Sequence, residues 1–284
     1  MNRFLRLLTL VVTLFLCLPV LADFDEDTQP EHKDRTPIYH IYDDVELTSI
    51  TKYHHGPSRM AIKLVYPQLN SDSLNEGIDG FNTHVLAVVN EELTKFKQQV
   101  EEQQALQKNM PKSVVKNELF IDFNSSFVKS HHDHLMSIRF SIQGFIGGMA
   151  HPYHYHRVLN YYLDANKPIE LEDIFASNAD FLSLLSSYSA NALFKRLENK
   201  EMIAEGTAPK ADNFKNWNIK SDGLLITFDE AQVAPYVNGA QTVLVPYAAL
   251  ASVIAEDSPL AYCVKHQKRC RANNLLTGGF IDEA

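Results

Sequence analysis

The chain has 284 residues, of which 45% are hydrophobic and 21% charged, and its formal net charge is −9 at pH 7. An acidic surface repels nucleic acid and anionic lipid, so these two classes of partner are excluded. The length suffices for one large domain or two modest ones, and no internal repeat or low-complexity tract interrupts it.

The first residues predict export. Arg3 and Arg6 precede an apolar run over residues 7–18, and Val20 and Ala22 supply the small side chains that a signal peptidase requires. We predict a Sec signal peptide, residues 1–22, cleaved after Ala22, which leaves a periplasmic or secreted protein without a membrane attachment. The alternative of a retained membrane anchor is disfavoured because the apolar run is short for a span. The mature chain carries 24 basic and 35 acidic residues, a net charge of −11.

The segment after the leader predicts a flexible arm and then strands. Residues 23–37 are acidic and polar, which is typical of a flexible arm, and the chain becomes strand-like from Ile38. Apolar side chains occupy alternate positions from Met60 to Tyr66, the pattern of a strand with one buried face. Pro67 is expected to end this strand.

A long helix is predicted next. Asp72 or Ser73 is expected to cap it, and its apolar residues recur at spacings of three and four. The pattern extends to about Leu106, before Met110 and Pro111. A helix of this length is suited to brace a sheet.

The middle of the chain predicts a hairpin and then a special loop. Residues 117–128 and 135–145 alternate as strands around a polar turn. Gly147 and Gly148 break the second strand, and a further strand is predicted at residues 158–163. The histidine-rich loop between them, residues 147–156, is the first candidate site.

The C-terminal half predicts a second amphipathic helix at residues 180–197, strands around residues 217–219, 224–228 and 241–245, and a last helix at 247–254. Strands joined by short turns, with a few helices, indicate an α+β fold with a mostly antiparallel sheet and helices on one face. Pro235 and Tyr236, before Asn238 and Gly239, predict an exposed anchoring loop, because tyrosine offers a large contact area with few rotors. A turn with a packed ring is the alternative.

Two cysteines remain after the leader is removed, Cys263 and Cys270. In an oxidising compartment they predict a disulfide that closes a basic tail, and this bridge is expected to lie apart from the core.

Several blocks occur in an order that resembles a known family. They are residues 147–152 (GGMAHP), 159–164 (LNYYLD), 171–175 (LEDIF), 222–224 (DGL), 233–239 (VAPYVNG) and 245–250 (VPYAAL). They resemble the RsiV-like C-terminal domain, the lysozyme-sensing ectodomain of certain anti-sigma factors. Residues 66–69 (YPQL) and the following helix look like the PdaC-like domain that precedes it. Met149 departs from the family pattern as an additional residue in the loop.

The resemblance implies a division into a PdaC-like N-terminal domain (38–115) and an RsiV-like C-terminal domain (116–255). The disulfide-closed tail (256–284), predicted from the two cysteines, follows them. It implies a non-catalytic cell-envelope binding protein, with c-type lysozyme or a peptidoglycan-related ligand as its partner. Anti-sigma activity is not expected, because very few residues precede the leader. The predicted partner-binding residues are Gly147, Gly148, His151, Pro152, Tyr153, Pro235, Tyr236 and Gly239.

The alternative is an enzyme, a zinc hydrolase that acts on envelope glycan. Its ligands would be His151, His154 and His156, since neutral imidazoles bind zinc and the last two share a face if the segment is extended. Against it, no HExxH spacing and no GxSxG elbow occurs in the sequence. We therefore predict no catalytic residue, no metal and no cofactor.

Overall fold

The computed structural model describes residues 39–56, 59–106 and 116–272, with side chains to residue 270. The predicted signal peptide (1–22), the whole predicted arm (23–37) and residue 38 lie outside the described residues, as does the end of the tail. The strands are β1 (Tyr39–Tyr42), β2 (Val45–Gly56), β3 (Met60–Asn70), β4 (Asn117–Ser130), β5 (Asp133–Phe145), β6 (Tyr153–Tyr162), β7 (Lys167–Pro168), β8 (Trp217–Ile219), β9 (Gly223–Phe228) and β10 (Gln241–Pro246). The helices are α1 (Glu76–Leu106), α2 (Phe181–Leu193), α3 (Lys200–Gly206), α4 (Tyr247–Leu250), α5 (Ala261–Lys265) and α6 (Gln267–Ala272), with short 3₁₀ turns η2 (Leu171–Ile174), η3 (Ala211–Phe214) and η4 (Tyr236–Asn238).

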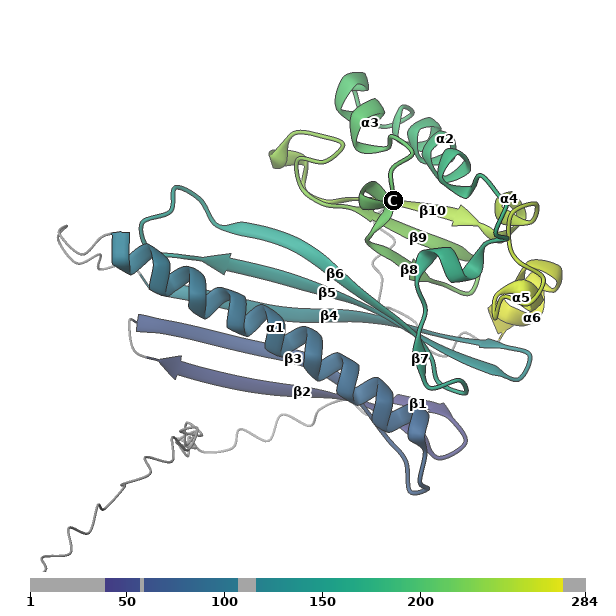
Figure 1. Cartoon of the computed structure of the whole chain (residues 1–284), viewed down its shortest axis with the longest axis horizontal. Coiled ribbons are helices and arrows are strands. Elements are labelled where there is room, and N and C mark those ends of the chain that lie inside the picture. Colours follow the sequence, from purple (N-terminus) through teal and green to yellow (C-terminus); the bar gives the residue numbers. More distant parts are fainter. Residues whose placement is uncertain (1–38, 57–58, 107–115, 273–284) are drawn as a thin grey trace, which may run out of the picture. The chain divides into compact units, whose positions relative to one another are not determined.

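The first seven strands form one sheet in chain order, from β1 to β7 (Figure 1). Neighbouring strands are antiparallel except β3 and β4, which are parallel and are connected through α1. The predicted α+β class with a mostly antiparallel sheet is confirmed. The sheet runs without a break across the predicted boundary at residues 115 and 116, and the domain division itself stays a prediction.

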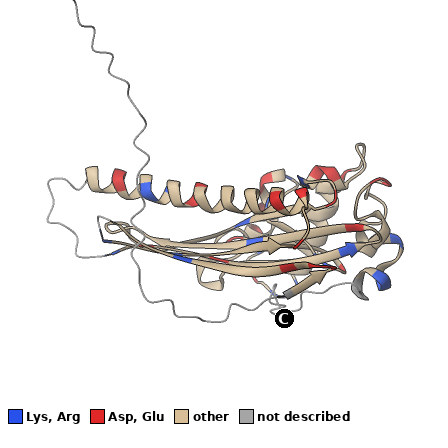
Figure 2. Ribbon diagram, turned by 90° about the horizontal axis from the view of Figure 1, so that it is seen from below, with Lys and Arg blue, Asp and Glu red and all other residues tan. Residues whose placement is uncertain are grey.

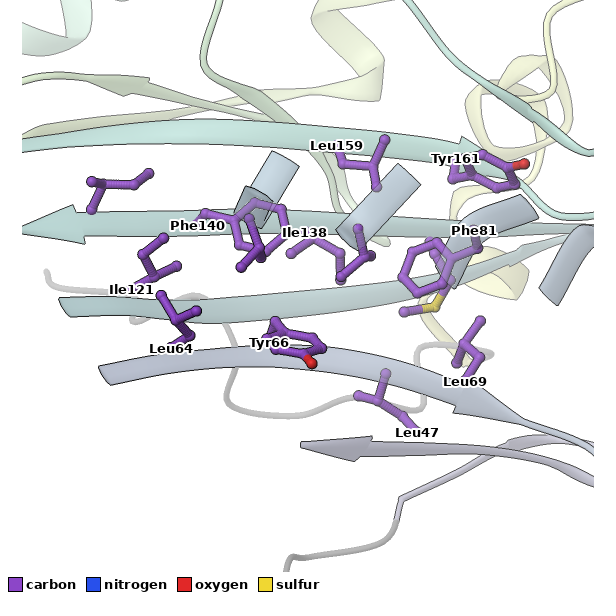
Figure 3. Close-up of a cluster of buried hydrophobic side chains, with 14 of the residues drawn as sticks. Leu47, Leu64, Tyr66, Leu69, Phe81, Ile121, Ile138, Phe140, Leu159 and Tyr161 are labelled. Carbon is purple, nitrogen blue, oxygen red and sulfur yellow. The ribbon is translucent and has the colours of Figure 1, made fainter. Parts of the chain in front are cut away.

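The two faces of this sheet are set by the alternation along β5. Ile138 and Phe140 point into a core shared with α1, together with Tyr66 of β3 and Leu159 of β6 (Figure 3). Their neighbours Ser137 and Arg139 therefore point to the opposite face, as the period of two requires. Figure 2 shows α1 along one face of the sheet, with acidic positions spaced along the helix.

Helix α1 covers the predicted range but begins later than its predicted cap. Asn75 is the cap, because its side-chain oxygen accepts from the backbone N–H of Gly77 and of Ile78, at 3.1 and 3.3 Å. The expectation of Asp72 or Ser73 is wrong, since the backbone N–H of both residues donates to the carboxylate of Asp44 instead. The loop before α1 is thereby tied to the β1–β2 turn.

Strand β3 passes through Pro67 and ends at Asn70, so the prediction that Pro67 ends it is wrong. β4 pairs with β3 only as far as Leu64, whereas β2 pairs with β3 along its whole length. Pro67 therefore lies where β3 has a neighbour on one side only. A proline, which lacks an N–H, is tolerated at such an edge.

A three-stranded sheet, in the order β10-β9-β8, packs on the face of β5 and β6 that is opposite to α1. A buried polar cluster joins the two sheets. Ser137 Oγ donates to Asn160 Oδ1 at 2.5 Å and accepts from Asn218 Nδ2 at 2.9 Å, and Asn160 Nδ2 donates to the carbonyl oxygen of Trp217 at 2.9 Å. Because buried amides and hydroxyls without partners are costly, this cluster fixes how the second sheet sits on the first.

The tail packs on the second core. Cys263 and Cys270 are joined by a disulfide, and both are fully buried among the side chains of the three-stranded sheet and its helices. Ser130 Oγ at the end of β4 donates to the carbonyl oxygen of Pro259 at 2.5 Å. The expectation of a bridge apart from the core is therefore wrong, because α5 and α6 bury it.

Candidate functional site

The first candidate loop links β5 to β6. Gly148 has a φ of 103°, a conformation that glycine adopts without strain, so the chain turns there. The backbone N–H of Gly147 donates to Asn117 Oδ1 at 2.8 Å and anchors the turn to the start of β4. The loop then presents Met149, His151 and Pro152, which are exposed. Met149 alone exposes 45% of its surface.

The second candidate loop links β9 to β10 and contains the 3₁₀ turn η4. Gly239 ends the turn with a φ of 68°, and nothing lies within 4 Å of the position that a Cβ would take there. Tyr236 and Val237 expose 53% and 91% of their surfaces. The tyrosine is an exposed side chain and not a packed ring.

The two loops meet in space although about eighty residues separate them. Tyr236 Oη donates to the carbonyl oxygen of Pro152 at 3.5 Å. The neighbouring Glu230 carboxylate is an alternative acceptor for the same hydroxyl proton, and a hydrogen bond to it raises the pKa of Tyr236. We call residues 147–152 and 235–239 together the two-loop surface. Its large exposed hydrophobic side chains are Met149, Tyr236 and Val237.

The predicted residues do not all belong to this surface. Gly148, His151, Pro152, Pro235 and Tyr236 are exposed in the two loops, Gly239 is half-buried there, and Gly147 is buried beneath.

Tyr153 departs from the predicted loop because it is the first residue of β6 and lies on the face toward α1. Its ring lies against Gly144 and stacks on Tyr155, with ring centroids 5.9 Å apart. Burial, with a smaller effect of the Glu92 carboxylate, raises the pKa of Tyr153 to about 12.

The prediction that the loop extends to His156 is wrong, because β6 begins at Tyr153. His154 and His156 alternate with Tyr153 and Tyr155, so the two histidines share the face opposite to α1. His156 Nδ1 lies 2.8 Å from Asp229 Oδ1, and His154 Nδ1 lies 3.0 Å from Glu230 Oε1. The two rings meet edge to face with centroids 4.8 Å apart.

The sequence-based prediction missed three residues of this cluster. Asp229 and Glu230 follow β9, and Ser141 lies on β5 with its Oγ 2.9 Å from His154 Nε2. The signal that could have revealed the histidines was the alternation Tyr-His-Tyr-His over residues 153–156, which is a strand pattern. Nothing in the linear spacing connects these residues. The pairing register of β5 and β6 places Ser141 near His154, and the segment after β9 brings Glu230 to the other side of that ring.

The alternative of a metal site finds no cluster in the part of the chain that the structure describes. Among residues 39–56, 59–106 and 116–272 no three His, Cys, Asp or Glu side chains are arranged to hold an ion. His154 and His156 each direct Nδ1 to a separate carboxylate. Over the same described ranges, no helix combines the length and the apolar character that crossing a membrane requires.

Comparisons with known proteins give a family match over part of the chain. Residues 172–248 match the family model described as "Protein of unknown function (DUF3298)". The peptidoglycan-N-acetylmuramic acid deacetylase PdaC of Bacillus subtilis (strain 168) is 30% identical over 144 residues, which are 50% of this chain. The chain matches only 30% of the length of that relative.

One solved structure shares the fold of this chain, and a second gives a lower similarity. A DUF3298 family member from Bacteroides fragilis NCTC 9343 superposes with a TM-score of 0.56 at 15% identity, over 82% of this chain and 98% of that one. A DUF3298 family protein from Pseudomonas aeruginosa PAO1 gives a TM-score of 0.48 at 15% identity, over 76% and 97% of the two chains. The Bacteroides likeness shows a shared fold alone. The family match and the deacetylase relative support a PdaC/DUF3298-type family, and they do not show the RsiV-like part of the resemblance.

Proposed function

We propose that this chain is an exported binding protein of the cell envelope that recognises a c-type lysozyme through the two-loop surface. The relative whose name places it on peptidoglycan supports an extracytoplasmic, envelope-related role. A peptidoglycan fragment is the alternative ligand for the same surface. The binding itself makes and breaks no covalent bond.

The observation that carries this proposal is the meeting of the two loops. The hydrogen bond from Tyr236 to Pro152 joins two loops that come from different sheets. The two loops expose Met149, Tyr236 and Val237, and apolar and aromatic side chains of this kind dominate the energy of protein interfaces. The rigid strands on both sides hold the loops in place before a partner arrives, which reduces the entropy lost on binding.

Charge supports a cationic partner. The predicted mature chain has a net charge of −11, and the Glu230 carboxylate lies beside Tyr236. Lysozymes of the c type are basic, so their encounter with this chain is accelerated by electrostatic attraction. Attraction between net charges is also the main source of nonspecific binding, so the experiment has to separate the two.

The test is isothermal titration calorimetry of the mature chain with a c-type lysozyme and, separately, with a soluble peptidoglycan fragment, at about 0.15 M salt where exposed charges are screened. Tyr236→Ala is expected to weaken lysozyme binding at least about tenfold, as the loss of a central aromatic anchor does. The matched control is Tyr53→Ala. Tyr53 lies on β2, outside the two-loop surface, and is 64% exposed. Equal weakening by both substitutions would show nonspecific attraction, and absence of heat with both ligands would refute the proposal.

A further inference from the structure

Four histidine–carboxylate pairs occur in the described residues. The pair His40–Glu46 is largely exposed, and among the other three one differs from the rest. His134 and His156 each place both the ring Nδ1 and their own backbone N–H on one carboxylate, that of Asp164 and of Asp229 respectively. Such double contacts clamp the backbone in place. In the third pair, His154 and Glu230, the second ring nitrogen meets the hydroxyl of Ser141.

We propose that Ser141, His154 and Glu230 form a serine hydrolase relay in which Ser141 is the nucleophile for carboxylic esters. The chain of contacts is Ser141 Oγ to His154 Nε2, 2.9 Å, and His154 Nδ1 to Glu230 Oε1, 3.0 Å. An ionised carboxylate can only accept, so the neutral ring carries its proton on Nδ1 and leaves the Nε2 lone pair for the serine hydroxyl. This is the order of roles that a nucleophile, a base and an orienting acid require.

The fold holds the three side chains on separate rigid elements. Ser141 lies on β5 opposite His156 in the register, so His154 is its diagonal neighbour on β6 and reaches across the same face. Glu230 is delivered by the segment after β9, where Ala231 has a φ of 63°. That left-handed conformation is unfavourable for alanine, and it persists because the surrounding contacts hold the turn.

The relay is accessible, as a reacting group has to be. Side-chain exposure is 20% for His154 and 15% for Glu230, against 7% for the ring of His156. Gln143 lies two residues beyond Ser141 on the same face and is exposed, with a carboxamide that can donate to a developing oxyanion. Phe120 faces Gln143 from β4 and supplies a half-buried apolar wall for an acyl group.

The reaction balances with water as the only co-reactant. Ser141 Oγ attacks the ester carbonyl carbon while His154 Nε2 takes the hydroxyl proton, and the carbonyl electron pair moves to oxygen. The bond to the leaving alcohol then breaks, and the alcohol takes the proton from His154. Water attacks the acyl-serine with the same base, which releases a carboxylic acid and restores the Ser141 hydroxyl. Glu230 is a positioning residue, because it acts through the imidazole.

The experiment uses the mature chain, p-nitrophenyl acetate and a fluorophosphonate probe. Wild type is expected to hydrolyse the ester and to carry the probe on the peptide that contains Ser141, whereas Ser141→Ala takes up no probe and loses at least about 100-fold in rate. The matched control is Ser73→Ala, which removes an exposed serine that donates to the Asp44 carboxylate but has no imidazole partner. This control is expected to react like wild type.

The substitution Glu230→Gln tests whether Glu230 positions the imidazole for catalysis or only stabilises the fold. It is expected to lower kcat about 100-fold with KM unchanged, and His154→Gln is expected to abolish the rise of rate with pH that a histidine base produces. Peptide mapping of labelled wild type keeps the test decisive if Ser141→Ala does not fold. Absence of labelling at Ser141 in folded wild type overturns the relay, and it leaves the lysozyme proposal standing because Tyr236 tests that separately.

Discussion

Replacement of Glu92 on α1 is expected to destabilise the protein strongly. The side chain is only 3% exposed, its Oε1 accepts from Arg157 Nη1 at 2.9 Å, and its Oε2 accepts from the Tyr155 hydroxyl. Both donors are on β6, so this carboxylate connects α1 to the sheet. Burial and the Glu92 hydrogen bond raise the pKa of Tyr155, which therefore remains a donor at neutral pH.

The size of the destabilisation follows from the hydrogen bonds that Arg157 and Tyr155 lose when Glu92 is removed. Each hydrogen bond to a charged group contributes about 1.5–3 kcal/mol, and removal of one partner of a buried ion pair costs about 3–5 kcal/mol. The Arg157 side chain is 32% exposed and keeps a second contact to Glu91, which lowers the penalty. We expect Glu92→Ala to lower the free energy of unfolding by about 2–4 kcal/mol, within the range for loss of a buried charge network.

Glu91 provides a matched control. Its carboxylate contacts the same guanidinium nitrogen, Arg157 Nη1, at the same distance of 2.9 Å, but its side chain is 65% exposed. An exposed pair of this kind contributes about 0–1 kcal/mol, so Glu91→Ala should change stability little.

The assay is urea unfolding read by far-ultraviolet circular dichroism, which reports α1, and by fluorescence of the single tryptophan, Trp217, which reports the three-stranded sheet. The reasoning is refuted if Glu92→Ala and Glu91→Ala differ by less than about 1 kcal/mol, the upper value for an exposed pair.

Three further predictions concern packing, the disulfide and pH. Gly77→Ala should lower the thermal midpoint, although alanine usually stabilises a helix by about 0.5–1 kcal/mol, because the new Cβ would lie 2.0 Å from the backbone oxygen of Leu163; an unchanged or higher midpoint would contradict this. Replacement of Cys263 and Cys270 by serine should cost about 2–3 kcal/mol in urea unfolding, from a loop with a separation of seven residues, and a reductant should then have no further effect. Tyr42 and Tyr153 have pKa values raised to about 12, mainly by burial, so their stabilisation is fully present below the unfolded value near 10 and is lost as pH rises from 10 to 12. Tyrosinate absorbance that grows gradually from pH 10, before unfolding, would count against this.

The sequence predicted those elements whose faces differ most in polarity. The alternation of Ile138, Phe140 and Ile142 along β5 and the spacing of apolar residues in α1 agree with the structure, because each has one face in a core. The residues that were predicted wrongly have tertiary partners. Asn75 replaces the predicted cap because Asp44 takes the backbone donors of Asp72 and Ser73.

The candidate sites show the same limit. The two glycines and the proline–tyrosine pair marked both loops, since turns need special backbone conformations that are visible in the sequence. The contact between the loops was not visible, because it depends on how the three-stranded sheet sits on β5 and β6. Ser141 looked like the polar half of an ordinary strand until the register placed it beside His154.

The parallel junction between β3 and β4 has a mechanical consequence. Five residue pairs join these strands, whereas eleven join β2 to β3 and thirteen join β4 to β5. Under tension applied across the sheet, we expect the β3–β4 pairing to separate first. Strands β1, β2 and β3 would then detach together, while the longer antiparallel pairs remain hydrogen-bonded. Because α1 packs on both β3 and β4, the packing of this helix on the sheet sets the force at which the two strands separate.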